Sequence, residues 1–65
     1  MLKEYLRGYR YKNNLTQKQM AHNLQTTQAY YCELESGKRI PGFKMTSRLA
    51  SFFKVSESYI RKLCK

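Results

Sequence analysis

The chain has 65 residues, which suffices for one small domain but not for a second core or a catalytic lobe. Hydrophobic residues make up 42% of it, a share that supports a compact core and disfavours wholesale disorder. Lys and Arg total 13 against four Asp and Glu, and the resulting net charge of +9 indicates a polyanionic partner, most often nucleic acid.

Near the N-terminus, apolar residues recur at the i, i+3, i+4, i+7 spacing of an amphipathic helix: Leu2, Tyr5, Leu6 and Tyr9. Asn13 and Asn14 end this first predicted helix, because Asn tolerates the left-handed conformation that follows a helix.

Thr16 begins a second helix of about eight residues. Its hydroxyl can accept from the N–H of Gln19, and the Gln19 side chain can return to the N–H of Thr16, which makes a capping box. Leu15 and Met20 flank the box as a hydrophobic staple. Gln25 and Thr26 then form a tight polar turn.

Thr27 caps a third helix, and Gly37 suits the left-handed position that ends it. The second and third helices share an inward face that we expect to contain Met20, Ala21, Leu24, Tyr31 and Leu34. Two short capped helices joined by a tight turn predict a helix-turn-helix from Thr16 to Gly37.

A basic loop follows, since Pro41 excludes helix immediately before it. A fourth helix is expected with Met45 and Phe52 on its flanks and an inward stripe of Phe43, Thr46, Leu49, Ala50 and Phe53. Ser56 caps a fifth helix, whose last turn holds Arg61, Lys62 and Lys65. Because no β-alternation appears, we expect an all-α fold of five helices in a single domain, residues 1–65.

With these elements in place, the sequence resembles the Cro/CI-type (Xre) helix-turn-helix family of lambda-repressor-like DNA-binding domains. The resemblance runs from about Leu6 to Ile60. It rests on Arg10, Leu15-Thr16-Gln17, Met20-Ala21, Leu24, Thr27, Leu34-Glu35-Ser36-Gly37-Lys38-Arg39, Pro41, Leu49-Ala50, Val55-Ser56 and Ile60. It implies a compact five-helix domain and a regulator of transcription, most often a repressor. Such a protein would bind double-stranded DNA sequence-specifically in the cytoplasm of a bacterium or of the host of a phage or mobile element.

Three positions depart from the family pattern. Family members usually carry glycine at the position of Gln25 and glycine or a similar residue at that of Lys54, so both would adopt unusual backbone angles at a cost on the order of 1 kcal/mol each. Tyr31 fills a core position commonly held by Ile or Val, so its ring has to be accommodated between the second and third helices.

In this family the second helix of the motif enters the major groove. The residues that it would offer to bases here are Thr27, Gln28, Ala29, Cys32 and Glu33. The Gln28 amide suits adenine, and Ala29 suits a thymine methyl group. Glu33 could accept from cytosine N4 or could repel phosphate and sharpen the register. A plain solvated face stays the alternative, although no Lys or Arg lies between Lys18 and Lys38.

Six residues are expected to contact phosphates: Arg10, Gln17, Tyr30, Lys38, Arg39 and Lys44. Gln17 matches the family's phosphate-contacting residue, and backbone N–H groups at the helix start would support it. Arg10 and Glu35 match a pair that links the first and third helices in this family. Each cation, taken singly, could also be an ordinary surface residue.

The resemblance also implies pairing of subunits through the last helix. We therefore expect a homodimer on a palindromic operator, with Phe52, Tyr59, Leu63 and Cys64 at its interface. The simpler alternative is that these side chains complete the core of a monomer. A second class of function stays open, a protein-interaction module of the same fold, antitoxin-like or a repressor's partner, with weak or no specific DNA binding.

Other classes are disfavoured. One His, no Asp and two distant Cys leave no acid–base or nucleophile constellation, so we expect no enzyme and no cofactor. Cys32, Cys64 and His22 lack metal-ligand spacing, and both thiols are expected to be reduced, with a redox role of Cys32 left open. No apolar run approaches the roughly 18 residues of a spanning helix, and helix caps argue against a membrane-active peptide.

Overall fold

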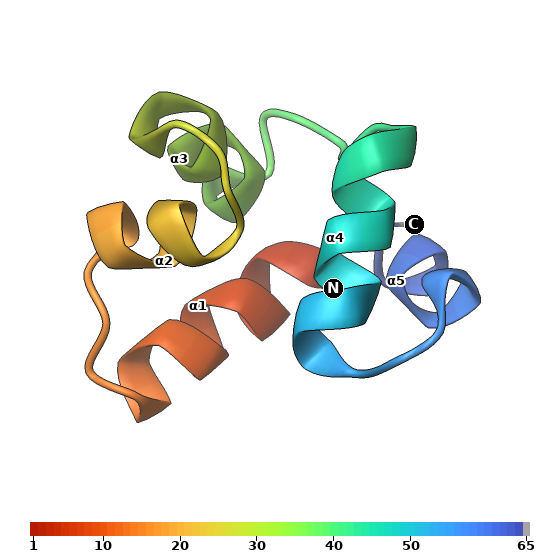
Figure 1. Cartoon of the computed structure of the whole chain (residues 1–65), viewed down its shortest axis with the longest axis horizontal. Coiled ribbons are helices and arrows are strands. Elements are labelled where there is room, and N and C mark those ends of the chain that lie inside the picture. The colour runs from red at the N-terminus through yellow and green to blue at the C-terminus, as the bar shows by residue number, and fades with distance from the viewer. Residues whose placement is uncertain (65) are drawn as a thin grey trace.

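The computed structural model describes residues 1–64, in which five helices follow one another (Figure 1). They are α1 (Leu2–Lys12), α2 (Gln17–Asn23), α3 (Gln28–Ser36), α4 (Phe43–Phe53) and α5 (Glu57–Leu63). No strand occurs in this range, so the all-α prediction is confirmed. Lys65, predicted in the last turn of the fifth helix, lies outside the described residues. Within the same range, no helix combines the length and apolar character needed to cross a membrane.

The three predicted side-chain caps are confirmed. The hydroxyls of Thr16, Thr27 and Ser56 each accept from a backbone N–H three residues on, at 3.0, 3.1 and 3.1 Å. The Gln19 side chain completes the capping box by accepting from the Thr16 N–H at 2.8 Å. Both helices of the helix-turn-helix therefore begin where local hydrogen bonding dictates.

The first four helices end in one and the same way. Each is followed by a residue with positive φ: Asn14 (55°), Gln25 (57°), Gly37 (83°) and Lys54 (58°). The next N–H then donates to the carbonyl five residues earlier at 2.9–3.0 Å: Leu15 to Arg10, Thr26 to Ala21, Lys38 to Glu33, and Val55 to Ala50. These are Schellman ends, which favour glycine. Gln25 and Lys54 thus adopt the strained backbone that the sequence predicted.

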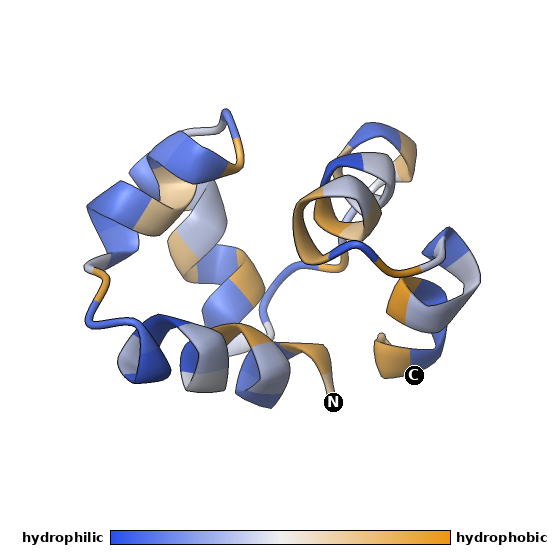
Figure 2. Ribbon diagram, turned by 60° about the horizontal axis from the view of Figure 1, so that its bottom comes forward, coloured by the Kyte–Doolittle hydropathy of each residue, from blue (hydrophilic) through white to orange (hydrophobic). Residues whose placement is uncertain are grey.

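One apolar core draws on all five helices. The buried hydrophobic residues are Leu2, Leu6, Met20, Ala21, Leu24, Tyr31, Leu34, Met45, Leu49, Ala50 and Ile60. α3 packs against both α1 and α2, and α4 packs against α5. Figure 2 shows hydrophobic and hydrophilic residues alternating along the helices, as amphipathic packing requires.

The predicted inward stripe of the fourth helix is wrong at one position. Phe43 is 79% exposed, whereas Met45, expected on the flank, is only 6% exposed. Phe43 is the first residue of α4, and side chains of a helix tilt toward its N-terminus. Its ring therefore extends past the end of the helix, and Met45 packs on the core together with Leu49, one turn further along α4.

A buried carboxylate joins the first three helices. The Glu35 side chain is 3% exposed and accepts from Nε and Nη2 of Arg10 at 2.8 Å each. The Tyr31 hydroxyl donates to it at 2.6 Å and the Gln17 amide at 3.1 Å. Arg10 also donates from Nη1 to the Leu15 carbonyl at 3.2 Å. α1, the start of α2 and the end of α3 are thereby held in one arrangement.

The ionised form of the Glu35 carboxyl group is strongly favoured over the protonated form. Burial alone would raise the pKa of Glu35, but hydrogen bonds from Arg10, Tyr31 and Gln17 outweigh burial and lower the pKa from 4.5 to about 2. Burial and the bond to Glu35 raise the pKa of the Tyr31 hydroxyl, which keeps it a donor. Tyr31 can therefore occupy the core position expected for it, because its buried hydroxyl donates to Glu35.

We expect Glu35→Gln to lower the free energy of unfolding by about 3–5 kcal/mol, because it leaves the Arg10 guanidinium buried without a counter-charge. Urea unfolding measures this loss. Glu57→Gln is the matched control, since Glu57 and Arg61 form an exposed pair, 41% and 64% accessible, whose loss changes stability by less than about 1 kcal/mol. A similar effect of the two substitutions would contradict the assignment.

Acid unfolding of the unchanged protein gives a second measurement if that variant does not fold. Because folding lowers the pKa of Glu35, its stabilisation is complete above the unfolded pKa near 4.5 and is lost as the pH falls toward 2. The loss over this window is on the order of 3 kcal/mol.

Gln25→Gly and Lys54→Gly are each expected to raise the free energy of unfolding by about 0.5–1 kcal/mol, since removal of left-handed strain exceeds the added entropy of the unfolded chain. Gly37→Ala is the control and should destabilise, because φ is +83° and a Cβ would lie 3.2 Å from Lys3 Cδ. Thermal unfolding checks all three. No gain from either glycine would show that these turns are unstrained.

Candidate nucleic-acid interface

The outer face of α3 begins with small and polar side chains that are open to solvent. Thr27, Gln28, Ala29 and Cys32 are all exposed. Gln28 and Ala29 are the first two residues of the helix, and Cys32 follows one turn later. Among the described residues, no hydrogen bond engages the Gln28 amide, so both its donor and its acceptor are free for a ligand.

Glu33 differs from these four residues because its carboxylate already has a partner. Its Oε1 accepts from Arg39 Nε at 2.8 Å, and the Arg39 guanidinium lies over the Tyr30 ring at 5.3 Å from the centroid. Three predicted site residues from α3 and the following loop therefore form one cluster at the surface.

Arg10 and Gln17 point inward, toward Glu35. Each nitrogen of the Arg10 guanidinium donates within the protein, to Glu35 or to the Leu15 carbonyl. Among the described residues, one N–H on Nη1 and one on Nη2 remain unused, but the Arg10 side chain is only 13% exposed. Gln17 uses one amide N–H on Glu35 and keeps the other, so it can bond Glu35 and a phosphate together.

Exposed cations lie close to α3, in the loop that follows it and on α4. Lys38 and Arg39 lie in the loop after it, and Lys44 lies in the first turn of α4. Arg48 was not predicted, yet it is exposed and donates to the Gln25 carbonyl in the helix-turn-helix turn at 3.0 Å. The sequence did contain a signal for it, because Arg48 follows Lys44 by one helical turn and so lies on the same face of α4. Lys44, Arg48 and Tyr30 all line a shallow hollow of about 250 Å³.

All four glutamates of the chain have cationic partners. Glu33 and Glu35 pair with Arg39 and Arg10 at 2.8 Å, while Glu4 and Glu57 pair with the N-terminal amine and Arg61 at 3.6 Å. No glutamate is therefore left to offset the exposed lysines near α3, and the field there is positive. A polyanion is the ligand that such a surface attracts.

The four predicted dimer-interface residues fall into two groups. Phe52 and Tyr59 belong to an edge-to-face aromatic cluster with Tyr5, Tyr9 and Phe53, whose ring centroids lie 4.9–6.0 Å apart across α1, α4 and α5. Tyr59 is 42% exposed, so this cluster reaches the surface.

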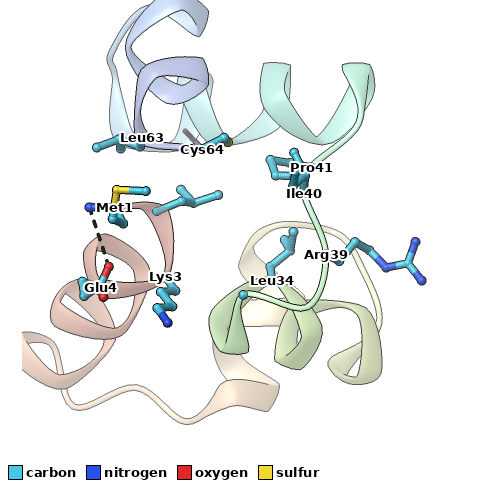
Figure 3. A pocket seen from close by; sticks show the side chains of 11 residues that line it. Met1, Lys3, Glu4, Leu34, Arg39, Ile40, Pro41, Leu63 and Cys64 are labelled. Carbon is cyan, nitrogen blue, oxygen red and sulfur yellow. Dashed lines mark ion pairs between the residues drawn. The ribbon is translucent and has the colours of Figure 1, made fainter.

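Leu63 and Cys64 instead line a hollow of about 440 Å³ between the start of α1, the α3–α4 loop and the end of α5 (Figure 3). Its other walls include Met1, Ile40 and Pro41. Burial raises the pKa of the Cys64 thiol, whose Sγ donates to the Ile60 carbonyl. Both cysteines are free thiols, and Cys32 is exposed.

Comparison with known proteins agrees with this geometry. The sequence profile of a helix-turn-helix domain matches residues 4–63, nearly the whole chain. No curated protein and no solved structure matches the sequence. Because the match spans all five helices, including the capped pair α2 and α3, the chain belongs to the helix-turn-helix domain family.

Proposed function

We propose that this protein regulates transcription by binding double-stranded DNA, with α3 in the major groove. The observation that carries the proposal is the outer face of α3, which offers amide, methyl and thiol groups beside exposed cations of the α3–α4 loop and α4. The Glu35 network supports it, because it fixes the angle at which α3 projects from α1 and α2. A preset helix loses less entropy on docking than a mobile one.

Gln28 is the leading candidate for base recognition, since its free amide can bond adenine N6 and N7 together. Thr27, Ala29 and Cys32 offer smaller contacts beside it, and methyl groups there suit thymine. Phosphate contacts would come from both sides of the groove, through Gln17, Tyr30, Lys38, Arg39, Lys44 and, in addition, Arg48. Arg10 would act chiefly by orienting α3 through Glu35.

The finer proposal is a repressor that binds a palindromic operator as a homodimer. Two recognition helices related by a two-fold axis would lie about 34 Å apart, one turn of DNA. The exposed edge of the aromatic cluster, at Phe52 and Tyr59, is the proposed contact. A net charge of +9 on each subunit opposes pairing in free solution, and DNA phosphates remove that repulsion. Light scattering of the operator complex should give two subunits per duplex, and one subunit would contradict the dimer.

A protein-interaction module is the second candidate. The hollow lined by Ile40, Leu63 and Cys64 favours it, because an open apolar depression can accept side chains from another protein. The two candidates differ most simply in whether duplex DNA binds.

The first prediction for the DNA proposal concerns salt. A random-sequence duplex should bind at 50 mM salt, and each engaged phosphate should contribute about −0.9 to the slope of log affinity against log salt. Four contacts would weaken binding roughly a hundredfold by 200 mM. Fluorescence anisotropy measures this. Absence of binding at 50 mM would reject the DNA proposal and favour the protein-interaction module.

The second prediction concerns Gln28. Selection of bound oligonucleotides would provide the operator, and Gln28→Ala should then weaken operator binding by about 1–3 kcal/mol while leaving the random duplex unaffected. Ser58→Ala on α5 is the control, since it removes an exposed polar group outside the proposed interface. Equal losses on both duplexes would show that Gln28 does not contact bases.

A further inference from the structure

The ion pair between Glu33 and Arg39 is closer than the other exposed pairs. Its N–O distance is 2.8 Å, against 3.6 Å both for Arg61 with Glu57 and for the N-terminal amine with Glu4. The Arg39 backbone N–H also donates to the Glu33 carbonyl at 3.3 Å. Backbone and side chain together therefore hold Arg39 against the last turns of α3.

The guanidinium has a second support in Tyr30. Its carbon lies 5.3 Å from the centroid of the Tyr30 ring, within the range of a cation–π contact. Tyr30 itself is half-buried against the core, so the ring is a fixed platform. The contacts with Glu33 and Tyr30 thus hold Arg39 at the outer face of α3, where its side chain is 51% exposed.

The pair is nevertheless open to exchange. The side chains of Arg39 and Glu33 are 51% and 44% exposed, so water and other anions reach both. An exposed pair of this kind is weak, and a phosphate in the right place forms an equally good charge-assisted bond with arginine. Whether Arg39 pairs with Glu33 or with DNA therefore depends on where the nearest phosphate lies.

We propose that Glu33 sets DNA specificity through Arg39, by holding the guanidinium on non-operator DNA and yielding it to a phosphate only when α3 is seated in the major groove. The inference rests on the proposed DNA binding by α3. Non-specific affinity is almost wholly electrostatic, so one neutralised arginine and one carboxylate at the groove lower it directly. In the seated complex the phosphate recovers the contact, and the ratio of specific to non-specific affinity rises.

Glu33 here is a positioning residue, and the competing assignment makes it a direct contact to cytosine N4. The two assignments predict opposite results for Glu33→Gln. Loss of a positioning carboxylate frees Arg39 and strengthens non-specific binding. Loss of a direct acceptor weakens operator binding at one cytosine and leaves non-specific binding unchanged.

The test compares Glu33→Gln with Glu57→Gln on a random-sequence duplex across several salt concentrations. Both variants remove one carboxylate from an exposed pair, 44% and 41% accessible, and both raise the net charge by one. We expect Glu33→Gln to bind about two- to fivefold more tightly than Glu57→Gln and to steepen the salt slope by about 0.9. The specificity ratio against the selected operator should fall by the same factor. Equal behaviour of the two variants overturns the inference, as does a loss confined to one operator cytosine.

A double-mutant cycle is completed by making Arg39→Ala both in the unchanged protein and in the Glu33→Gln variant. With Glu33 present, it should flatten the salt slope on the operator by about 0.9 but leave the slope on the random duplex unchanged. In the Glu33→Gln variant it should flatten both slopes. Equal flattening on the random duplex in the two backgrounds overturns the inference. If the unchanged protein fails to bind DNA, the proposed function falls first, whereas normal binding without the Glu33 effect rejects only this inference.

Discussion

The arrangement of the first three helices depends on one buried carboxylate. Helices α2 and α3 have 7 and 9 residues, too short to be stable in isolation, so caps and tertiary contacts have to hold them. Glu35 supplies a contact to each, because Arg10 comes from α1, Gln17 from α2 and Tyr31 from α3 itself. Two charges withdrawn from water stabilise the fold only when such partners satisfy them. The angle of α3 relative to α1 and α2 is therefore set by electrostatics as well as by packing.

Most of the fold was predictable from local sequence signals. Thr16, Thr27 and Ser56 indicated the helix starts, since a capping hydroxyl acts within three residues and needs no tertiary information. Strain at Gln25 was expected for a different reason, because the family that the sequence resembles usually carries glycine at this turn position. Phe43 was not, because helical periodicity gives a direction around the axis but does not tell whether other elements extend far enough to cover the first turn.

The sequence indicated which residues belong to the candidate site, but not which of them pair with one another. Sequence spacing placed Gln28, Ala29 and Cys32 on one exposed face, where they lie. It could not show that Glu33 pairs with Arg39 across the end of α3, because the path of the loop after Gly37 decides which side chains meet. Arg48 was missed for a related reason, since its partner is a backbone carbonyl 23 residues away.

Two carboxylates on α3 illustrate how burial decides the role of a charge. Glu33 and Glu35 are two residues apart and so face opposite sides of the helix, one toward solvent and one toward the core. Both bind arginine at 2.8 Å, yet Glu35 is 3% exposed and Glu33 is 44% exposed. The first pair is almost wholly withdrawn from solvent, whereas both side chains of the second pair are accessible to water and to dissolved anions. The same kind of pair, arginine with glutamate, is therefore a buried structural link on one face of α3 and a solvent-accessible contact on the other.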